Sequence, residues 1–278
     1  MMARKPNAIP GGAAMPLDRA GTAKAFGTEG NASEQTGTSI FDPVLCEIAY
    51  RWFCPPGGTV LDPFAGGSVR GVVAGVLGRH YVGVDLRSEQ IAANRAQWDD
   101  ISSRIGDADK IVPAWHIGDS AQVVPGLDVE ADMLMSCPPY GDLEVYSDDP
   151  CDISAMPSDD FDRLYAQIIA VACAKLKPDR FAFWVVGEYR TKGGGYANLV
   201  GKTVAAFEAA GLAYYNEAIL LTAIGSLPIR AAKAFRSGRK LGKTHQNILV
   251  FCKGDPKRAA LARGEVEISP LPDPDLPE

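Results

Sequence analysis

The sequence predicts an α/β domain built on a mostly parallel, doubly wound sheet. Apolar segments typical of strands alternate with segments that show helical spacing of apolar residues, from about residue 43 to residue 254. Three of the strand-like segments end at an aspartate, and a glycine-rich turn joins the first of them to the next helix. Such alternation is typical of parallel sheets, whose ligands bind beyond the carboxyl ends of the strands. We therefore expect a functional site at that edge of the sheet.

The first half of the domain is expected to hold three strands. Residues 43–53 follow Asp42 and begin with Pro43, which predicts a helix with an aspartate cap and a proline in its first turn. Strands are expected at 59–62, 80–86 and 111–119, with helices at 69–77 and 88–98 between them.

The second half is expected to continue the sheet. Residues 129–136 are apolar along nearly their whole length, which predicts a strand buried on both faces. A helix at 161–176, a strand at 180–189 and a helix at 198–211 follow, and the last two strands are expected within 213–224 and at 246–254. The main domain is assigned to residues 38–256, between a flexible segment, 1–37, and an acidic, proline-rich tail, 257–278.

The composition is that of a globular protein from a reducing compartment. Of the 278 residues, 46% are hydrophobic and 22% are charged, and no segment approaches the roughly 18 apolar residues of a membrane span. The first residues lack the apolar core of a signal peptide, so we expect a cytoplasmic protein with no membrane partner. Six scattered cysteines and three dispersed histidines predict reduced core thiols and no metal site.

The charge distribution indicates a surface for a polyanion. The formal net charge is −6, but residues 265–278 carry five acids and no base. Residues 222–246 carry bases and no acid, between two expected strands, and we expect a long loop there that contacts nucleic-acid phosphates. Its bases are Arg230, Lys233, Arg236, Arg239, Lys240 and Lys243. The alternative is a solvated surface loop.

The segment DPFAGGSVRG, residues 62–71, is typical of a ligand-binding turn between a strand and a helix. It lacks the G-x-G-x-x-G dinucleotide fingerprint, and Asp62 would repel a pyrophosphate, so a cofactor without phosphate fits better. Asp85 ends the second strand and can accept from ribose hydroxyls, while Asp119 ends the third and can accept from an adenine amino group. Three carboxylates favour a positively charged nucleoside such as S-adenosylmethionine. The alternative is that they are helix caps and surface acids.

A second unusual segment, SCPPY at residues 136–140, ends the buried strand. Pro138 and Pro139 have no N–H groups, so the carbonyls at the end of this strand lack ladder partners. This ending indicates that those carbonyls bind something else.

SCPPY occurs together with FDP at 41–43, VLDPFAGG at 60–67, GVDL at 83–86 and GDS at 118–120. With these motifs the chain resembles the amino-directed DNA methyltransferases, which modify adenine N6 or cytosine N4. The resemblance extends from about residue 39 to residue 254. It implies a Rossmann-like methyltransferase domain over residues 38–256 with an antiparallel last strand, S-adenosylmethionine as methyl donor, and DNA with a flipped target base. It places Phe41, Asp62, Phe64, Ala65, Gly66, Gly67, Asp85, Asp119 and Ser120 at the cofactor, and Cys137, Pro138, Pro139 and Tyr140 at the base.

The resemblance also implies a role for the proline-rich ending. An exocyclic amine is a poor nucleophile because its lone pair is delocalised into the base, so the site must accept hydrogen bonds from its two N–H groups. The Cys137 side chain and the Pro138 carbonyl would do this, and Tyr140 would stack on the base. Most relatives have Asp, Asn or Ser in place of Cys137, which is a weak acceptor, so Ser136 could supply the bond instead. Because Cys is nearest in size to Ser, cytosine N4 is slightly favoured over adenine N6.

Other interpretations of these residues stay open. Cys137 could be a covalent nucleophile, as in cytosine C5 methyltransferases, although in those enzymes the proline precedes the cysteine. Cys137 could also be a structural cysteine in a proline turn. The protein could methylate RNA or a glutamine side chain, or be an inactive DNA-binding relative. No segment is large enough for a separate target-recognition domain. We therefore expect a short recognition sequence, or recognition shared with a second copy or a partner subunit.

Overall fold

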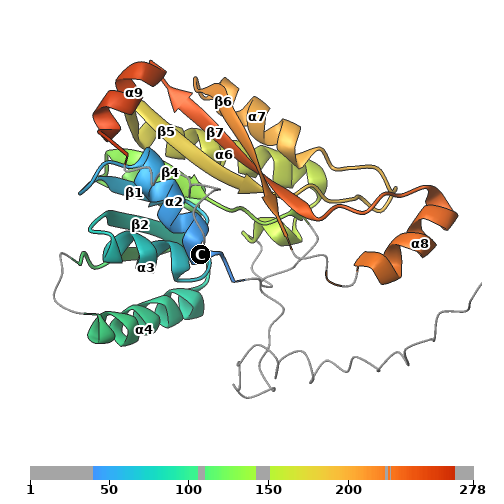
Figure 1. Cartoon of the computed structure of the whole chain (residues 1–278), viewed down its shortest axis with the longest axis horizontal. Helices are drawn as coiled ribbons and strands as arrows, with labels where there is room; N and C mark the ends of the chain where they lie inside the picture. Colours follow the sequence, from blue (N-terminus) through green and yellow to red (C-terminus); the bar gives the residue numbers. More distant parts are fainter. Residues whose placement is uncertain (1–39, 106–109, 142–150, 223–224, 226, 267–278) are drawn as a thin grey trace, which may run out of the picture. The chain divides into compact units, whose positions relative to one another are not determined.

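The computed structural model describes residues 40–105, 110–141, 151–222, 225 and 227–266. Their strands form a seven-stranded sheet of order β3-β2-β1-β4-β5-β7-β6 (Figure 1). β7 is antiparallel to both of its neighbours, whereas the pairs from β3 to β5 are parallel. The strands are β1 Thr59–Asp62, β2 His80–Asp85, β3 Ala114–Ile117, β4 Ala131–Ser136, β5 Leu176–Val186, β6 Ala213–Leu221 and β7 His245–Lys253. The predicted fold class, with its antiparallel last strand, is confirmed.

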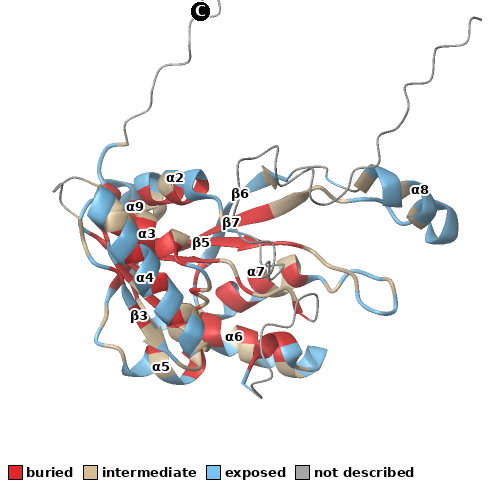
Figure 2. Ribbon diagram, turned by 90° about the horizontal axis from the view of Figure 1, so that it is seen from below, coloured by how far each residue is buried: buried red, intermediate tan, exposed pale blue. Residues whose placement is uncertain are grey.

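Helices cover both faces of the sheet (Figure 2). α2, α3, α4 and α9 contribute buried side chains to the apolar core on one face, and α5, α6 and α7 to the core on the other. All six residues of β4 are buried, as its apolar sequence predicts. The helices are α2 Pro43–Phe53, α3 Val69–Val76, α4 Ser88–Arg104, α5 Ser120–Gly126, α6 Ser158–Lys175, α7 Leu199–Ala209, α8 Leu227–Gly238 and α9 Pro256–Arg263, with a 3₁₀ turn, η2, at Ile153–Ala155.

Two aspartates begin helices that position the site. Asp42 Oδ1 accepts from the N–H of Val44 at 2.8 Å and caps α2, as predicted. Asp119 Oδ1 accepts from the N–H of Ala121 at 2.9 Å and caps α5, a helix that the sequence did not predict. β3 is shorter than the expected strand at 111–119, because Pro113 has no N–H to donate to a neighbouring strand.

Two predictions about chain segments are wrong in part. The expected loop at 222–246 contains helix α8, none of whose residues is buried. The expected tail at 257–278 begins inside α9, where Asp255 caps the helix and Ala259 is buried in the core. The folded domain therefore extends beyond residue 256. Residues 267–278 and the expected flexible segment 1–37 lie outside the described residues. Among the described helices, none has the length and apolar content to cross a membrane.

Candidate active site

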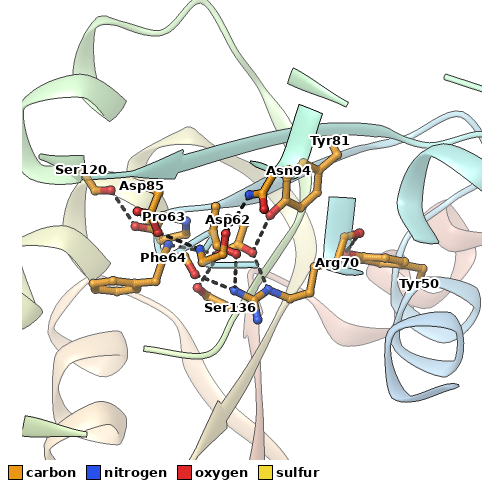
Figure 3. A network of polar contacts seen from close by, with 12 residues as sticks. Tyr50, Asp62, Pro63, Phe64, Arg70, Tyr81, Asp85, Asn94, Ser120 and Ser136 are labelled. Atoms are coloured by element: carbon orange, nitrogen blue, oxygen red, sulfur yellow. Dashed lines mark hydrogen bonds and ion pairs between the residues drawn. The ribbon is translucent and has the colours of Figure 1, made fainter. Parts of the chain in front are cut away.

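The glycine-rich turn after β1 lies against the end of β2 and the start of α5 (Figure 3). The N–H of Gly66, whose φ of +49° suits glycine, donates to Asp85 Oδ2 at 2.9 Å. Ser120 Oγ donates to the carbonyl of Pro63 at 2.6 Å, next to Asp119. The predicted cofactor residues at three neighbouring strand ends therefore come together at the carboxyl edge of the sheet.

The carboxylate of Asp85 faces the backbone of this turn and of the next helix. Besides the bond from Gly66, its Oδ1 accepts from the N–H of Arg87 at 3.0 Å. Burial raises the pKa of Asp85 above its ordinary value, against the opposing effects of these N–H groups and of the Arg87 guanidinium. Because each carboxylate oxygen has two acceptor sites, Asp85 keeps capacity for a ligand hydroxyl.

The carboxylate of Asp62 is fully buried and bound by the protein itself. Its Oδ1 accepts from the N–H of Phe64 at 3.1 Å and from Ser136 Oγ at 2.5 Å. Its Oδ2 accepts from Arg70 Nε at 2.6 Å and from the Tyr81 hydroxyl at 2.8 Å. Four protein donors thus surround the residue that was expected to face a cofactor (Figure 3).

Arg70 holds the turn from the inside, a role that its position in α3 did not reveal. The side chain is buried, and its second terminal nitrogen donates to the carbonyls of Phe64 at 2.6 Å and of Ala65 at 2.9 Å. The guanidinium also lies over the ring of Phe41, 4.8 Å from its centroid. Phe41, Phe64 and Ala65, all predicted cofactor residues, are therefore fixed by one arginine.

Asn94 of α4 is a second residue that supports the glycine turn from outside it. It is fully buried, and its Nδ2 donates to the carbonyl of Gly66 at 2.7 Å. No motif marks this asparagine, because the contact joins a helix to a turn 28 residues earlier in the chain. It completes the polar support of the glycine turn.

The two sequence motifs meet through Ser136. This serine ends β4 directly before Cys137, and its hydroxyl bonds to Asp62 at the end of β1. β1 and β4 are adjacent parallel strands, with Leu61 paired to Leu134. The glycine turn and the SCPPY segment therefore lie side by side, as an edge-to-edge meeting of cofactor and base requires.

Tyr140 is held by its own segment and by two segments that are distant in sequence. Its hydroxyl lies 3.4 Å from Cys137 Sγ and accepts a hydrogen bond of 2.7 Å from Gln246 Nε2 in β7. A Cβ added to Gly187, just beyond β5, would lie 3.1 Å from the Tyr140 ring, so the glycine lets the ring pack on the backbone. Gln246 is a further residue that no motif indicated.

The predicted nucleic-acid contacts lie on and after α8, which extends away from the sheet in both views (Figures 1 and 2). The Arg239 guanidinium lies 5.1 Å from the centroid of Phe235, an exposed side chain. Lys243 Nζ donates to Asn247 Oδ1 at 3.1 Å, which ties the segment to β7. Arg230, Lys233 and Arg236 lie on α8 itself, and Arg239, Lys240 and Lys243 follow it.

Features elsewhere in the described residues do not compete with this site. A hollow of about 410 Å³ lies at the opposite edge of the sheet, lined by 127–130, 174–178 and Lys253, and it contains none of the predicted site residues. The described part of the chain holds no cluster of three or more potential metal ligands. Four of the six cysteines are buried, as predicted for core thiols.

The fold is the Rossmann-like fold of class I S-adenosylmethionine-dependent methyltransferases, defined by the strand order and the antiparallel β7. Comparison of the sequence with protein-family models gave no match, and comparison with curated proteins gave none. Comparison with solved structures did find proteins of similar fold. TrmN from Thermus thermophilus has 18% sequence identity and a TM-score of 0.51 over 78% of this chain. The match spans 51% of TrmN, so this chain corresponds to about half of that protein.

Two further structures match at lower TM-scores. A putative rRNA-methylase from Clostridium thermocellum has 13% identity and a TM-score of 0.47, over 77% of this chain and 98% of that one. A TehB-like SAM-dependent methyltransferase from Corynebacterium glutamicum has 16% identity and a TM-score of 0.47, over 84% of this chain and 94% of that one. Identities this low do not specify a substrate.

Proposed function

We propose that this protein transfers a methyl group from S-adenosylmethionine to the exocyclic amine of a base flipped out of DNA. The observation that carries the proposal is the hydrogen bond of 2.5 Å from Ser136 to Asp62. It joins the end of the SCPPY strand to the first residue of the glycine turn. A methyl donor over the turn and an amine at Cys137–Tyr140 would then meet across two neighbouring strand ends.

The turn fits a nucleoside that carries a positive charge. A Cβ added to Gly67 would meet no atom within 4 Å, so open space borders the turn. Asp85 and Asp119 supply the acceptors that would hold the ribose hydroxyls and the adenine amino group. We propose that Asp62 acts through Arg70 and Ser136 to shape the turn, since four protein donors already bind its carboxylate.

The SCPPY segment fits the activation of an amine. The Pro138 carbonyl would accept a hydrogen bond from one N–H of the amine. The other N–H would donate either to the Cys137 sulfur, which lies beside the Tyr140 hydroxyl, or to Ser136. When bound, S-adenosylmethionine would supply an electrophilic methyl group to the amine; its sulfur would keep the electron pair of the S–C bond, and the amine would release one proton to solvent water. The contribution of the protein is alignment of the two partners.

Cytosine N4 stays slightly favoured over adenine N6 as the methylated atom, because Cys137 is nearest in size to serine. DNA is favoured over a glutamine side chain because six cations lie on and after α8, and such a cluster favours an extended polyanion over a single protein tail. Sharing of recognition with a second copy or a partner subunit remains a prediction.

Transfer of a labelled methyl group tests the proposal. The protein is incubated with labelled S-adenosylmethionine in three separate reactions, which contain duplex DNA, structured RNA or a glutamine-containing protein extract. We expect label in the DNA. Label in RNA or protein alone would assign the site to the corresponding relative, and tight cofactor binding without any transfer would support an inactive DNA-binding protein.

A further inference from the structure

The segment after β5, residues 190–196 with the sequence RTKGGGY, folds into a short hairpin, here called the glycine hairpin. Arg190 and Tyr196 pair as an antiparallel bridge. The N–H of Thr191 donates to the carbonyl of Gly195 at 2.9 Å, and the N–H of Gly194 donates to that of Thr191 at 2.8 Å. The hairpin is therefore an ordered structure, with three glycines at its tip.

The glycine hairpin lies beside the basic segment that follows α8. A Cβ added to Gly194 would lie 3.3 Å from Lys240 Nζ, so the lysine side chain crosses the hairpin where a larger residue would obstruct it. Both segments extend beyond the same end of the sheet (Figure 1). Residues far apart in the sequence thus contribute to one surface.

This surface gathers positive charge. Arg190 and Lys192 of the hairpin join Arg239 and Lys240, and residues 189–198 contain no acid. Glu188, just before the hairpin, uses Oε1 to accept from the N–H of Leu199 at the start of α7. Four cations on an exposed surface repel one another, and a polyanion would relieve that repulsion.

An aromatic ring stands among these cations. Tyr196 is 49% exposed, and the Arg190 guanidinium lies 4.1 Å from the centroid of its ring. Arg190 also donates to the carbonyl of Gly194 at 2.9 Å, so its position is fixed before any ligand binds. A cation stacked on an exposed ring is an arrangement that binds the phosphates and bases of an extended strand.

The hairpin also has open space on its surface and borders the candidate base site. A Cβ added to Gly195 would meet no atom within 4 Å, so a strand could approach its backbone closely. Arg190 follows Gly187, which packs under the Tyr140 ring, by three residues. The chain therefore passes directly from the base site into the hairpin.

We propose that the glycine hairpin and Lys240 form a second nucleic-acid contact, which grips the phosphate backbone of the DNA strand that carries the target base, with Tyr196 stacking on a neighbouring base. This inference rests on the proposed function and deepens it. The hairpin then extends the basic surface that begins on α8 toward the candidate base site.

The test measures binding of a fluorescent duplex over a range of salt concentrations. The variants are Lys192→Gln and Lys240→Gln, singly and together, Tyr196→Ala, and as control Lys257→Gln, an exposed lysine of α9. Each lost phosphate contact should lower the slope of log K against log salt by about 0.9, and each lysine variant should weaken binding about 3- to 10-fold. The double variant should raise KM for DNA more than either single lysine variant does.

Separate outcomes decide the two claims. Methyl transfer to DNA by the unchanged protein tests the proposed function. If that transfer occurs but the double variant keeps the slope and KM of the control, the glycine hairpin does not contact DNA. If the unchanged protein binds RNA and not DNA, the assignment of this surface to DNA is overturned.

Discussion

The side-chain amide of Gln246 donates a hydrogen bond of 2.7 Å to the hydroxyl of Tyr140, 106 residues earlier in the chain. The same hydroxyl lies 3.4 Å from Cys137 Sγ. Either the tyrosine hydroxyl or the cysteine thiol can be the donor in this second contact. β7 therefore sets the orientation of the residue that is proposed to stack on the base.

Replacement of Gln246 by Leu tests this positioning role. The variant keeps the volume of the side chain but removes the donor, so we expect kcat for methyl transfer to fall about 10-fold with little change in cofactor affinity. Gln246→Glu also lacks the amide donor, but its carboxylate can accept a hydrogen bond from the Tyr140 hydroxyl, so this variant should lose less activity than the leucine variant. Gln122→Leu, on the exposed surface of α5, is the matched control. Equal rates for the Gln246 and Gln122 variants would show that the bond does not matter.

Two substitutions of Tyr140 separate the contribution of base stacking from that of its hydrogen bonds. Tyr140→Ala removes the ring and should lower transfer at least about 100-fold, since the ring is expected to offset the unstacking of the base. Tyr140→Phe keeps the ring and should stay within about 10-fold of the unchanged protein. Calorimetric titration with S-adenosylmethionine should give the same affinity for all three proteins. Full transfer by the alanine variant would contradict the stacking role.

The ion pair between Arg70 and Asp62 is expected to stabilise the turn strongly. Arg70→Met leaves a buried carboxylate without its cation, and such losses cost about 3–5 kcal/mol of unfolding free energy. Adding Asp62→Asn should recover part of that cost, so the two substitutions should not be additive. Arg104→Met, which breaks an exposed pair with Asp100, should cost less than about 1 kcal/mol. Urea unfolding measures all four variants, and additive losses at Arg70 and Asp62 would argue against the pair.

Asp85 links cofactor binding to pH. Its pKa is raised by burial, so as the pH falls the carboxylate takes up a proton earlier than an ordinary aspartate does. The ionised form is the better acceptor for ribose hydroxyls, and we expect affinity for S-adenosylmethionine to be constant above the raised pKa and to decline as the pH falls through it. Asp85→Asn should weaken binding about 10-fold or more at neutral pH and remove this acid limb. An unchanged acid limb in the variant would assign it to another group.

The sequence predicts the sheet well because its signals are local. The continuous apolar stretch of β4 and the Asp42 cap of α2 each depend on neighbouring residues alone. α8 was missed because no side chain on it is buried. α9 was missed because the acids and prolines beyond it dominate the composition of residues 257–278.

The candidate site could be proposed in outline from the sequence, and its internal supports could not. The glycine turn and SCPPY are contiguous motifs, so their residues could be named from the sequence. Gln246, Asn94 and Arg70 act through contacts that exist only once strands and helices pack together. Asp62 shows the limit most clearly, because only its burial among four donors reveals that its carboxylate serves the fold.

Identification of the modified nucleoside tests the central claim most directly. Unmethylated plasmid DNA is incubated with the protein and S-adenosylmethionine, digested to nucleosides and analysed by mass spectrometry with chromatographic standards. We expect N4-methylcytosine or N6-methyladenine, absent when Tyr140→Ala replaces the unchanged protein. 5-Methylcytosine would mean that Cys137 attacks the ring as a nucleophile, and DNA without any methylated base would contradict the proposed function.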